Sequence, residues 1–301
     1  MLTIGTRGSQ LALWQANWVA ARLRESGVDS RIEVIKTTGD KITDVALSEV
    51  GGKGLFTKEL EDALLERRID IAVHSMKDMP TGLPAGLRLA AVPPREDPRD
   101  AVVGKKLSEL RAVAVVGTSS LRRAAQLRAM RPDLTVGSIR GNLDTRLRKL
   151  DDGDYDAIVL AAAGLRRLGW QERIAELLDP GEMCPAVGQG ALAIEARDEE
   201  GAVTAACMRL ADEATWQEVT AERALLGALG GGCQVPIGAH GVVSDGELHL
   251  QAVVCAPDGR RTIRREARGR AEHAARVGVE LAGQLLAAGA SDILESVYGA
   301  A

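Results

Sequence analysis

The sequence has few aromatic residues, which make up 2% of its 301 positions. They are Trp14, Trp18, Phe56, Tyr155, Trp170, Trp216 and Tyr298. Since 46% of the residues are hydrophobic, we expect a core built mainly from Ala, Val, Leu and Ile. The length is sufficient for two or three domains.

Cysteine is also scarce, and its spacing excludes one class of site. The four cysteines, Cys184, Cys207, Cys233 and Cys255, include no C-x-x-C pair, so we expect no zinc site of the usual spacing and no other metal. We interpret three of them as free thiols in ordinary mixed sequence. The fourth, Cys233, directly follows three glycines in GGGCQVPIG, which gives its thiol few packing partners. This pattern indicates a sulfur that is presented to a ligand.

Long apolar runs are absent as well, and this bears on the expected location. No run approaches the length needed to cross a bilayer. The first residues, MLTIGTRGSQLALWQA, lack the basic start and the apolar stretch of a signal peptide. We therefore expect a cytoplasmic protein that has no membrane partner.

The motifs of nucleotide-binding proteins are incomplete. The segment GGKGLF, residues 51–56, is superficially similar to a phosphate-binding loop, but Gly54 stands where that loop needs Ser or Thr. No G-x-G-x-x-G motif opens either series of strands and helices described below. Nucleotide binding is therefore disfavoured.

Positive charge is concentrated in one part of a protein whose net charge is −4. Residues 111–150 contain nine basic and two acidic side chains but no Phe, Tyr or Trp. Binders of single-stranded nucleic acid usually place aromatic side chains among the basic ones. The pattern therefore favours a small polyanion over nucleic acid. The alternative is a set of solvated arginine faces on helices.

Strand-like and helical segments alternate over the first two thirds of the chain, which predicts βαβ units and a parallel sheet. Helices are predicted from an N-cap at Ser9 and over residues 56–68, 120–130 and 142–150. The predicted strands, some with their exit turns, are residues 2–7, 31–37, 69–75, 112–120, 135–141, 156–164 and 191–197.

The last part of the chain has a different pattern. A helix is predicted over residues 216–229, and it ends at the glycine run. Three strand-like segments follow, with hairpin turns at Asp245-Gly246 and Asp258-Gly259, and residues 271–288 predict a closing helix. Two α/β domains and a smaller α+β domain fit this order of elements better than one large fold.

Three strand-to-helix turns carry arginine side chains. Arg7 lies in GTRGS, Arg122 and Arg123 lie in GTSSLRR, and Arg140 lies in IRGN. A helix N-terminus presents unpaired N–H groups and the positive end of the helix dipole. A guanidinium group binds carboxylate or phosphate in bidentate geometry. The three turns together therefore predict an anion-binding site.

The segment HSMKDMPT, residues 74–81, follows a predicted buried strand and places His74, Lys77 and Asp78 within five positions. The carboxyl end of a strand is where open α/β sheets bind ligands. Asp78 can act there as a general acid or base, or stabilise a positive charge on a substrate nitrogen. The alternative is a surface turn with a local Lys–Asp pair.

Six motifs together closely resemble one enzyme family. They are GGKGLFTKELE, HSMKDMPT, GTSSLRR, IRGNLDTRL, PAVGQGALAIE and GGGCQVPIG. On these motifs the chain resembles the porphobilinogen deaminase (hydroxymethylbilane synthase) family from about Ile4 to Tyr298, and no motif position departs from the family pattern.

The resemblance implies an α/β fold with two domains similar to periplasmic binding proteins, a cleft between them, and a smaller α+β C-terminal domain. The implied domains are residues 1–94 with 190–211, residues 95–189, and residues 212–301, the last of which carries Cys233.

The resemblance also implies a reaction. A dipyrromethane cofactor, linked to Cys233 through a thioether, primes the head-to-tail condensation of four porphobilinogen molecules with loss of ammonia. Hydrolysis then releases the linear tetrapyrrole hydroxymethylbilane. Asp78 matches the family's catalytic carboxylate, which interacts with pyrrole nitrogens, assists the loss of ammonia and stabilises the azafulvene cation.

Each pyrrole bears an acetate and a propionate, so the resemblance accounts for the basic residues as carboxylate binders. By motif match, the cofactor-binding residues are Cys233, Lys77, Ser75, Ser119, Ser120, Arg122, Arg123, Arg140, Arg146 and Gln189. The substrate-binding residues are Arg7, Ser9, Gln15, Lys53, Arg140, Arg146 and Arg167.

A second function class is a non-catalytic protein that binds or senses a small anion on the same two-domain fold. That reading leaves the GGGC segment without an explanation. We expect a monomer whose partner is the small molecule porphobilinogen and which binds no nucleic acid.

Overall fold

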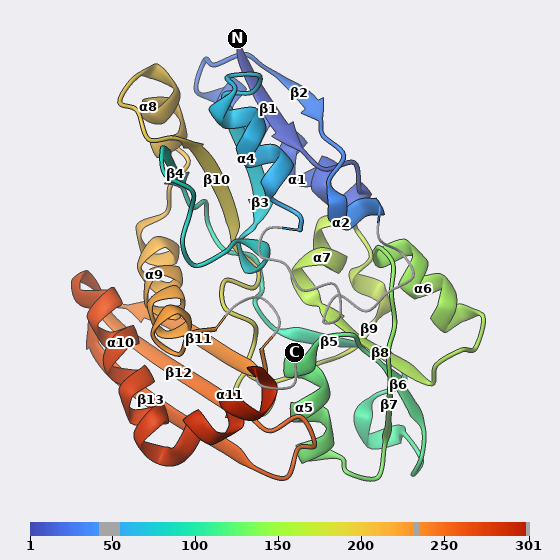
Figure 1. Cartoon of the computed structure of the whole chain (residues 1–301). Helices are drawn as coiled ribbons and strands as arrows, with labels where there is room; N and C mark the ends of the chain where they lie inside the picture. The colour runs from blue at the N-terminus through green and yellow to red at the C-terminus, as the bar shows by residue number, and fades with distance from the viewer. Residues whose placement is uncertain (42–54, 232–234, 299–301) are drawn as a thin grey trace.

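The structure is a computed structural model that describes residues 1–41, 55–231 and 235–298. Its strands form two sheets of five strands and one of three. Figure 1 shows the first five-stranded sheet at the top, the second at the lower right and the three-stranded sheet at the lower left. The predicted fold class, α/β with a smaller α+β part at the C-terminus, is confirmed. The predicted domain boundaries stay predictions.

The first sheet has the strand order β2-β1-β3-β10-β4. Its strands are β1 (Leu2–Thr6), β2 (Ser30–Val34), β3 (Ile71–Ser75), β4 (Leu87–Ala91) and β10 (Leu192–Arg197). The helices of this part are α1 (Gln10–Glu25), α2 (Thr38–Lys41), α4 (Lys58–Leu65) and α8 (Ala202–Met208). The core between α1 and the sheet is aliphatic, as the composition predicts, and contains Val19, Leu23 and Ile194.

The second sheet has the order β7-β6-β8-β5-β9. Its strands are β5 (Asp100–Gly104), β6 (Val115–Gly117), β7 (Thr135–Gly137), β8 (Ala157–Ala161) and β9 (Ile174–Leu177). The helices are α5 (Leu121–Met130), α6 (Leu143–Asp151) and α7 (Ala162–Arg167), with short 3₁₀ segments η2 (Leu107–Glu109) and η3 (Gln171–Arg173).

The prediction of parallel sheets is only partly correct. β1 is parallel to β2 and β3, and β6 is parallel to β7 and β8. In contrast, β10 is antiparallel to β3 and β4, and β5 is antiparallel to β8 and β9. The chain passes from the first sheet into the second at β5, and from the second back into the first at β10. No helical crossover within one sheet therefore sets their direction.

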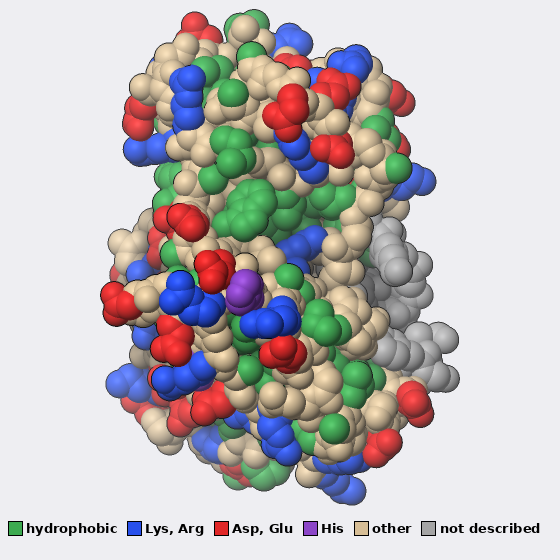
Figure 2. All heavy atoms as spheres, turned by 90° about the vertical axis from the view of Figure 1, so that its left-hand side faces the viewer, with side chains coloured by type: hydrophobic (Ala, Val, Ile, Leu, Met, Phe, Trp, Pro, Cys, Tyr) green, Lys and Arg blue, Asp and Glu red, His purple; other side chains and the backbone are tan. Residues whose placement is uncertain are grey.

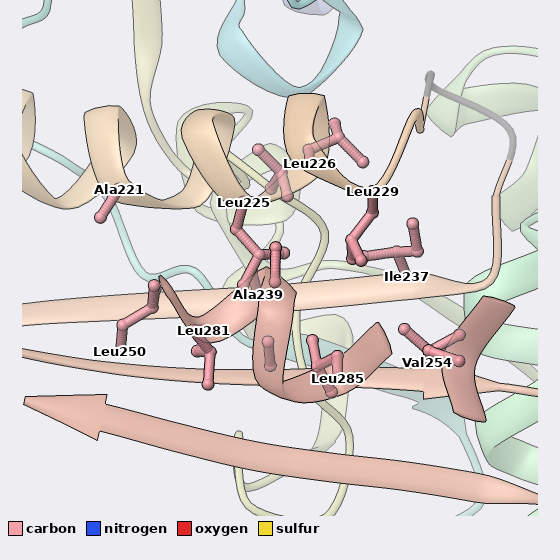
Figure 3. Packing of buried hydrophobic residues seen from close by; sticks show 14 of the residues in the cluster. Ala221, Leu225, Leu226, Leu229, Ile237, Ala239, Leu250, Val254, Leu281 and Leu285 are labelled. Carbon is pink, nitrogen blue, oxygen red and sulfur yellow. The ribbon is translucent and has the colours of Figure 1, made fainter. Parts of the chain in front are cut away.

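The third sheet is the predicted meander of β11 (Ile237–Ser244), β12 (Glu247–Cys255) and β13 (Thr262–Arg270). Asp245 and Gly246 have φ angles of 53° and 74°, as a two-residue type I′ turn requires. Figure 3 shows one face of this sheet packed against α9 (Glu213–Ala228) and α10 (Ala274–Leu285), with Leu225 and Leu281 among the buried side chains.

One helical stretch, Ala271–Val297, is long and apolar enough by length and composition alone to cross a membrane, and it is the only such stretch among the described residues. It consists of η4 (Ala271–His273), α10, the π-turn η5 (Leu286–Ala290) and α11 (Ser291–Tyr298). Charged residues interrupt the apolar ones, so the sequence contains no unbroken apolar run of this length. Val277, Leu281 and Leu294 are buried in the core of the third sheet. Gly289, with a φ of 92°, interrupts the helical path. These features are typical of a core helix.

Two connectors between the first and second sheets, residues 92–99 and 185–191, are hydrogen-bonded to each other. The Glu96 N–H donates to the Gly190 carbonyl at 3.2 Å, and Arg95 Nε donates to the Gln189 carbonyl at 2.9 Å. Gly190 has a φ of 90°, and a Cβ atom there would lie 2.2 Å from the Glu96 carbonyl oxygen. Only glycine fits this close approach of two backbones.

We predict that Gly190→Ala lowers the free energy of unfolding by at least about 3 kcal/mol, because it adds a backbone clash to an unfavourable φ. Gly153→Ala is the matched control. Gly153 has a φ of 85° and has no atom within 4 Å of its Cβ position, so this change should cost only about 1 kcal/mol. Urea denaturation measures both, and equal losses would show that the connectors are not in close contact.

Candidate functional site

Asp78 lies at the end of η1 (Met76–Asp78), a 3₁₀ turn that directly follows β3. β3 is buried up to its last residue, so the predicted position of Asp78 after a buried strand is confirmed. The Met76 N–H donates to the carbonyl of Ala191, the residue just before β10, at 3.0 Å, which attaches the turn to the connector that leads into β10. Gln15 Nε2 on α1 donates to Ser75 Oγ at 2.9 Å.

A cleft of about 960 Å³ lies between the first and second sheets. This volume is within the range of small-molecule sites, about 300–1,000 Å³. Its walls come from α1 and β3 on one side and from β8, α6 and α7 on the other. The predicted site residues that line it are Arg7, Ser9, Gln15, Ser75, Lys77, Asp78, Arg123, Arg140, Arg146 and Arg167.

The N-caps of α1 and α6 line the cleft. Ser9 is the N-cap of α1, as predicted, and its Oγ accepts a hydrogen bond from the Ala12 N–H at 3.3 Å. Asn142 is the N-cap of α6. Ser9 and Asn142 both line the cleft, where the positive ends of the two helix dipoles favour an anion.

Basic side chains outnumber acidic ones around the cleft. The acidic residues among the described lining residues are Asp78 and Asp144. The basic ones are Arg7, Lys36, Lys77, Arg123, Arg140, Arg146, Lys149 and Arg167. Such a surface attracts a ligand with several negative charges.

Besides Arg123, whose pKa burial also lowers, three of these cations have lowered pKa values. Burial lowers the pKa of Lys77 to about 8, although the charge of Asp78 raises it. Burial, together with the charges of Arg123 and Arg140, lowers the pKa of Arg146 to about 10. Burial also lowers the pKa of Arg167 to about 10. Carboxylates of a bound ligand would stabilise the charged forms of all three.

Two of the predicted arginines have a buried carboxylate of the protein as their partner. Asp100 binds Arg122 Nη1 at 2.7 Å and Arg123 Nε at 2.9 Å. Burial would raise the pKa of Asp100, but the two guanidinium groups hold it well below its usual range. Arg123 also lines the cleft, whereas Arg122 does not. The Nη1 of Arg122 donates instead to the Cys184 carbonyl at 2.6 Å.

Three further predicted residues, Ser119, Ser120 and Gln189, are not among the described residues that line the cleft. Ser119 Oγ donates to the Ile139 carbonyl at 2.5 Å, and Ser120 is the N-cap of α5. The buried Gln189 donates to the Pro98 carbonyl at 2.7 Å and to Asp100 at 2.9 Å. The contacts of these residues stabilise the second sheet and the connectors. Their predicted role in cofactor binding stays a prediction.

The structure adds cleft residues that the sequence analysis did not assign. Lys36 follows β2, and Lys149 lies one turn after Arg146 on α6, a spacing that could have identified it. Phe56 lines the cleft, and the guanidinium carbon of Arg7 lies 4.1 Å from the centre of its ring. This cation–π contact joins residues distant in sequence, so no local pattern predicts it.

The three other cysteines can also be placed. Cys184, Cys207 and Cys255 are buried free thiols, as predicted. Burial raises the pKa of Cys184 and of Cys207 to about 12, which makes both unreactive near neutral pH. Lys53 and Cys233 lie outside the described residues.

Two family models match the chain. Residues 2–205 match the model described as "Porphobilinogen deaminase, dipyromethane cofactor binding domain", and residues 216–287 match "Porphobilinogen deaminase, C-terminal domain". Two curated relatives are both named porphobilinogen deaminase. The one from Syntrophobacter fumaroxidans is 50% identical over 100% of this chain and 99% of its own length. The one from Pelobacter propionicus is 54% identical over 99% of this chain and 97% of its own.

A solved structure of the methionine-binding protein MetQ is a more distant match. It is 12% identical, covers 72% of this chain and 89% of its own, and has a TM-score of 0.44.

The low pKa of Lys77 predicts a dependence of stability on pH. Between the pKa of about 8 in the folded chain and the ordinary lysine pKa of 10.5, the unfolded chain binds more protons at this residue than the folded chain does. Stability from this group therefore rises with pH in that window. The free energy of unfolding of the reference protein, minus that of Lys77→Met, should increase from pH 8 to pH 10.5.

The measurement is made in a Cys233→Ser background, so that no group attached at that cysteine adds carboxylates beside Lys77. Groups that titrate identically in both proteins cancel in the difference. A difference that stays constant over this pH range would contradict the lowered pKa.

Proposed function

The chain belongs to the porphobilinogen deaminase family, whose members are transferases of tetrapyrrole biosynthesis. We therefore propose that it condenses four porphobilinogen molecules head to tail with loss of ammonia. Hydrolysis then releases the linear product hydroxymethylbilane. The observation that carries this proposal is the position of Asp78 on the wall of a cleft whose other charged side chains are mostly basic.

The residues of the cleft fit the cofactor of the family. Residues 2–205 match the family model of the dipyrromethane cofactor binding domain. Each pyrrole of that group bears two carboxylates. Burial lowers the pKa values of Lys77, Arg146 and Arg167, and nearby carboxylates would raise these pKa values again. We propose that Cys233 holds the group through a thioether. When bound, the dipyrromethane supplies the pyrrole carbon to which the first substrate unit is joined.

We propose that some of the basic residues bind the cofactor, some bind the substrate, and two bind both. Lys77, Arg123, Arg140 and Arg146 would bind cofactor carboxylates, and Arg7 and Arg167, with Arg140 and Arg146, would bind those of the substrate. Charge-assisted hydrogen bonds of this kind contribute about 1.5–3 kcal/mol each. Ser9 and Gln15 would add neutral contacts, and the N-termini of α1 and α6 would add further attraction for carboxylates.

Asp78 performs the chemical role in this proposal. Its carboxylate would accept a hydrogen bond from the pyrrole N–H of porphobilinogen and hold the ring in place. Loss of ammonia leaves a positive charge on the substrate ring, and the negative charge of Asp78 would stabilise that charge. Lys36, Arg140 and Arg146 cannot do this, because their charge has the wrong sign. Asp144, the other acidic lining residue in the described part of the chain, lies on α6, in the opposite wall from β3.

A non-catalytic anion-binding protein is the alternative, and family membership does not favour it. A coloured product with an acidic aldehyde reagent for pyrroles would separate the two, because only the enzyme should carry a pyrrole group after purification. We also propose that the chain works as a monomer in the cytoplasm, without nucleic acid or a membrane as partner.

We predict that Asp78→Asn lowers kcat by roughly a hundred- to ten-thousandfold, the usual cost of losing a positioned acid or base. KM for porphobilinogen should change little, because the arginines that bind the substrate carboxylates are intact. Asp151→Asn is the control, since Asp151 lies outside the cleft and pairs with the partly exposed Arg173. An unchanged kcat with a raised KM would show that Asp78 only helps to bind the substrate.

A further inference from the structure

Helix α9, outside both walls of the cleft, packs against the segment that carries Asp78. We call residues 76–81 the Asp78 turn. Trp216, Val219 and Arg223 of α9 have spacings that place them on one face of the helix. Met76 and Met79 of the turn form a buried cluster with Val219, and Trp216 packs against it. Figure 2 shows the side of the molecule on which α9 lies, where hydrophobic side chains gather at mid-height.

Arg223 extends this contact with hydrogen bonds to the backbone of the turn. Its Nη2 donates to the Pro80 carbonyl at 2.8 Å and to the Thr81 carbonyl at 3.0 Å. Its Nη1 lies 3.9 Å from Met76 Sδ. The guanidinium group therefore contacts the chain on both sides of Asp78. Because its donors are fixed in one plane, it holds both carbonyls in one geometry.

The opposite side of the turn is already fixed by the connector 185–191. A Cβ atom at Gly188 would lie 2.4 Å from Met76 Cγ, and the Met76 N–H donates to the Ala191 carbonyl. Met76 is therefore closely packed on that side. The C-terminal half of the turn, after Asp78, is held by Arg223.

The residue next to Arg223 connects α9 to the connectors themselves. Glu222 accepts hydrogen bonds from the Gly188 N–H at 2.6 Å and from Arg95 Nη1 at 2.7 Å. Adjacent residues of α9 therefore hold the connectors and the Asp78 turn. The opposite face of α9 packs on the third sheet through Ala221 and Leu225 (Figure 3). The position of the turn is thus tied to the C-terminal part of the chain.

We propose that Arg223 is a positioning residue for the reaction, which fixes the carboxylate of Asp78 in the cleft by holding the Pro80 and Thr81 carbonyls. This inference rests on the proposed function, in which Asp78 is the catalytic carboxylate. Arg223 does not line the cleft, so the proposed action on the substrate passes through the Asp78 turn. A displacement of about 1 Å at a reacting group can cost about a hundredfold in rate.

The test compares Arg223→Met, which keeps the length of the side chain but removes its donors, with Arg223→Lys. Arg223→Met should lower kcat about ten- to hundredfold and change KM for porphobilinogen less than threefold, because the arginines of the cleft remain. Arg223→Lys keeps one donor group and should recover part of the loss. Arg276→Met is the control, because Arg276 is exposed on α10. An unchanged kcat in Arg223→Met would overturn the proposal.

A double variant separates positioning from a general structural role. If Arg223 acts through Asp78, then Arg223→Met should cost less than threefold in an Asp78→Asn background, where the carboxylate is already gone. The same ten- to hundredfold loss in both backgrounds would show that Arg223 stabilises the fold generally, and would overturn the proposal. If Arg223→Met does not fold, Arg223→Lys enters the same cycle with the same criterion.

The same data distinguish failure of this inference from failure of the proposed function. A normal kcat in Asp78→Asn alone removes the catalytic role of Asp78, and the positioning role of Arg223 with it. An impaired Asp78→Asn together with a fully active Arg223→Met removes only the role of Arg223.

Discussion

The structure depends on keeping several positive charges close together in a cleft that is partly shielded from water. Like charges at such distances repel, and burial adds a further cost for each. The lowered pKa values of Lys77, Arg146 and Arg167 reflect that cost. The buried carboxylate of Asp100 reduces this electrostatic cost, because it neutralises part of the charge of Arg122 and Arg123. The remaining charge is available to a ligand with several carboxylates.

The carboxylate of Asp78 in this basic environment has to be held firmly, because the surrounding cations attract it from several directions. The structure attaches the turn that carries Asp78 on two sides. The connector 185–191 holds Met76, and α9 packs on Met79 and holds the Pro80 and Thr81 carbonyls. Both supports reach the turn from segments that follow it by more than a hundred residues. The geometry at Asp78 is therefore set by tertiary contacts.

This explains which parts of the molecule can be predicted from the sequence. β3, the N-cap Ser9 and the Asp245-Gly246 turn follow from local patterns, and so do the arginines beside helix starts. The short strands β4, β5 and β9 and the helices α7 and α8 lack a clear period, so they were missed. The antiparallel direction of β10 and the Arg7–Phe56 contact depend on how distant segments pack. The partnership of Arg122 with Asp100 could not be predicted either, since a sequence does not show which arginines are buried.

In the function proposed here, the cleft binds a dipyrromethane group attached to Cys233. The most direct test is the intact mass of the purified protein. The chain should be heavier than its sequence by one dipyrromethane, Cys233→Ser should have the mass of its sequence, and serine at Cys184, Cys207 or Cys255 should leave the excess mass in place. A fully active chain with the mass of its sequence alone, or an excess mass that persists in Cys233→Ser, would contradict the account.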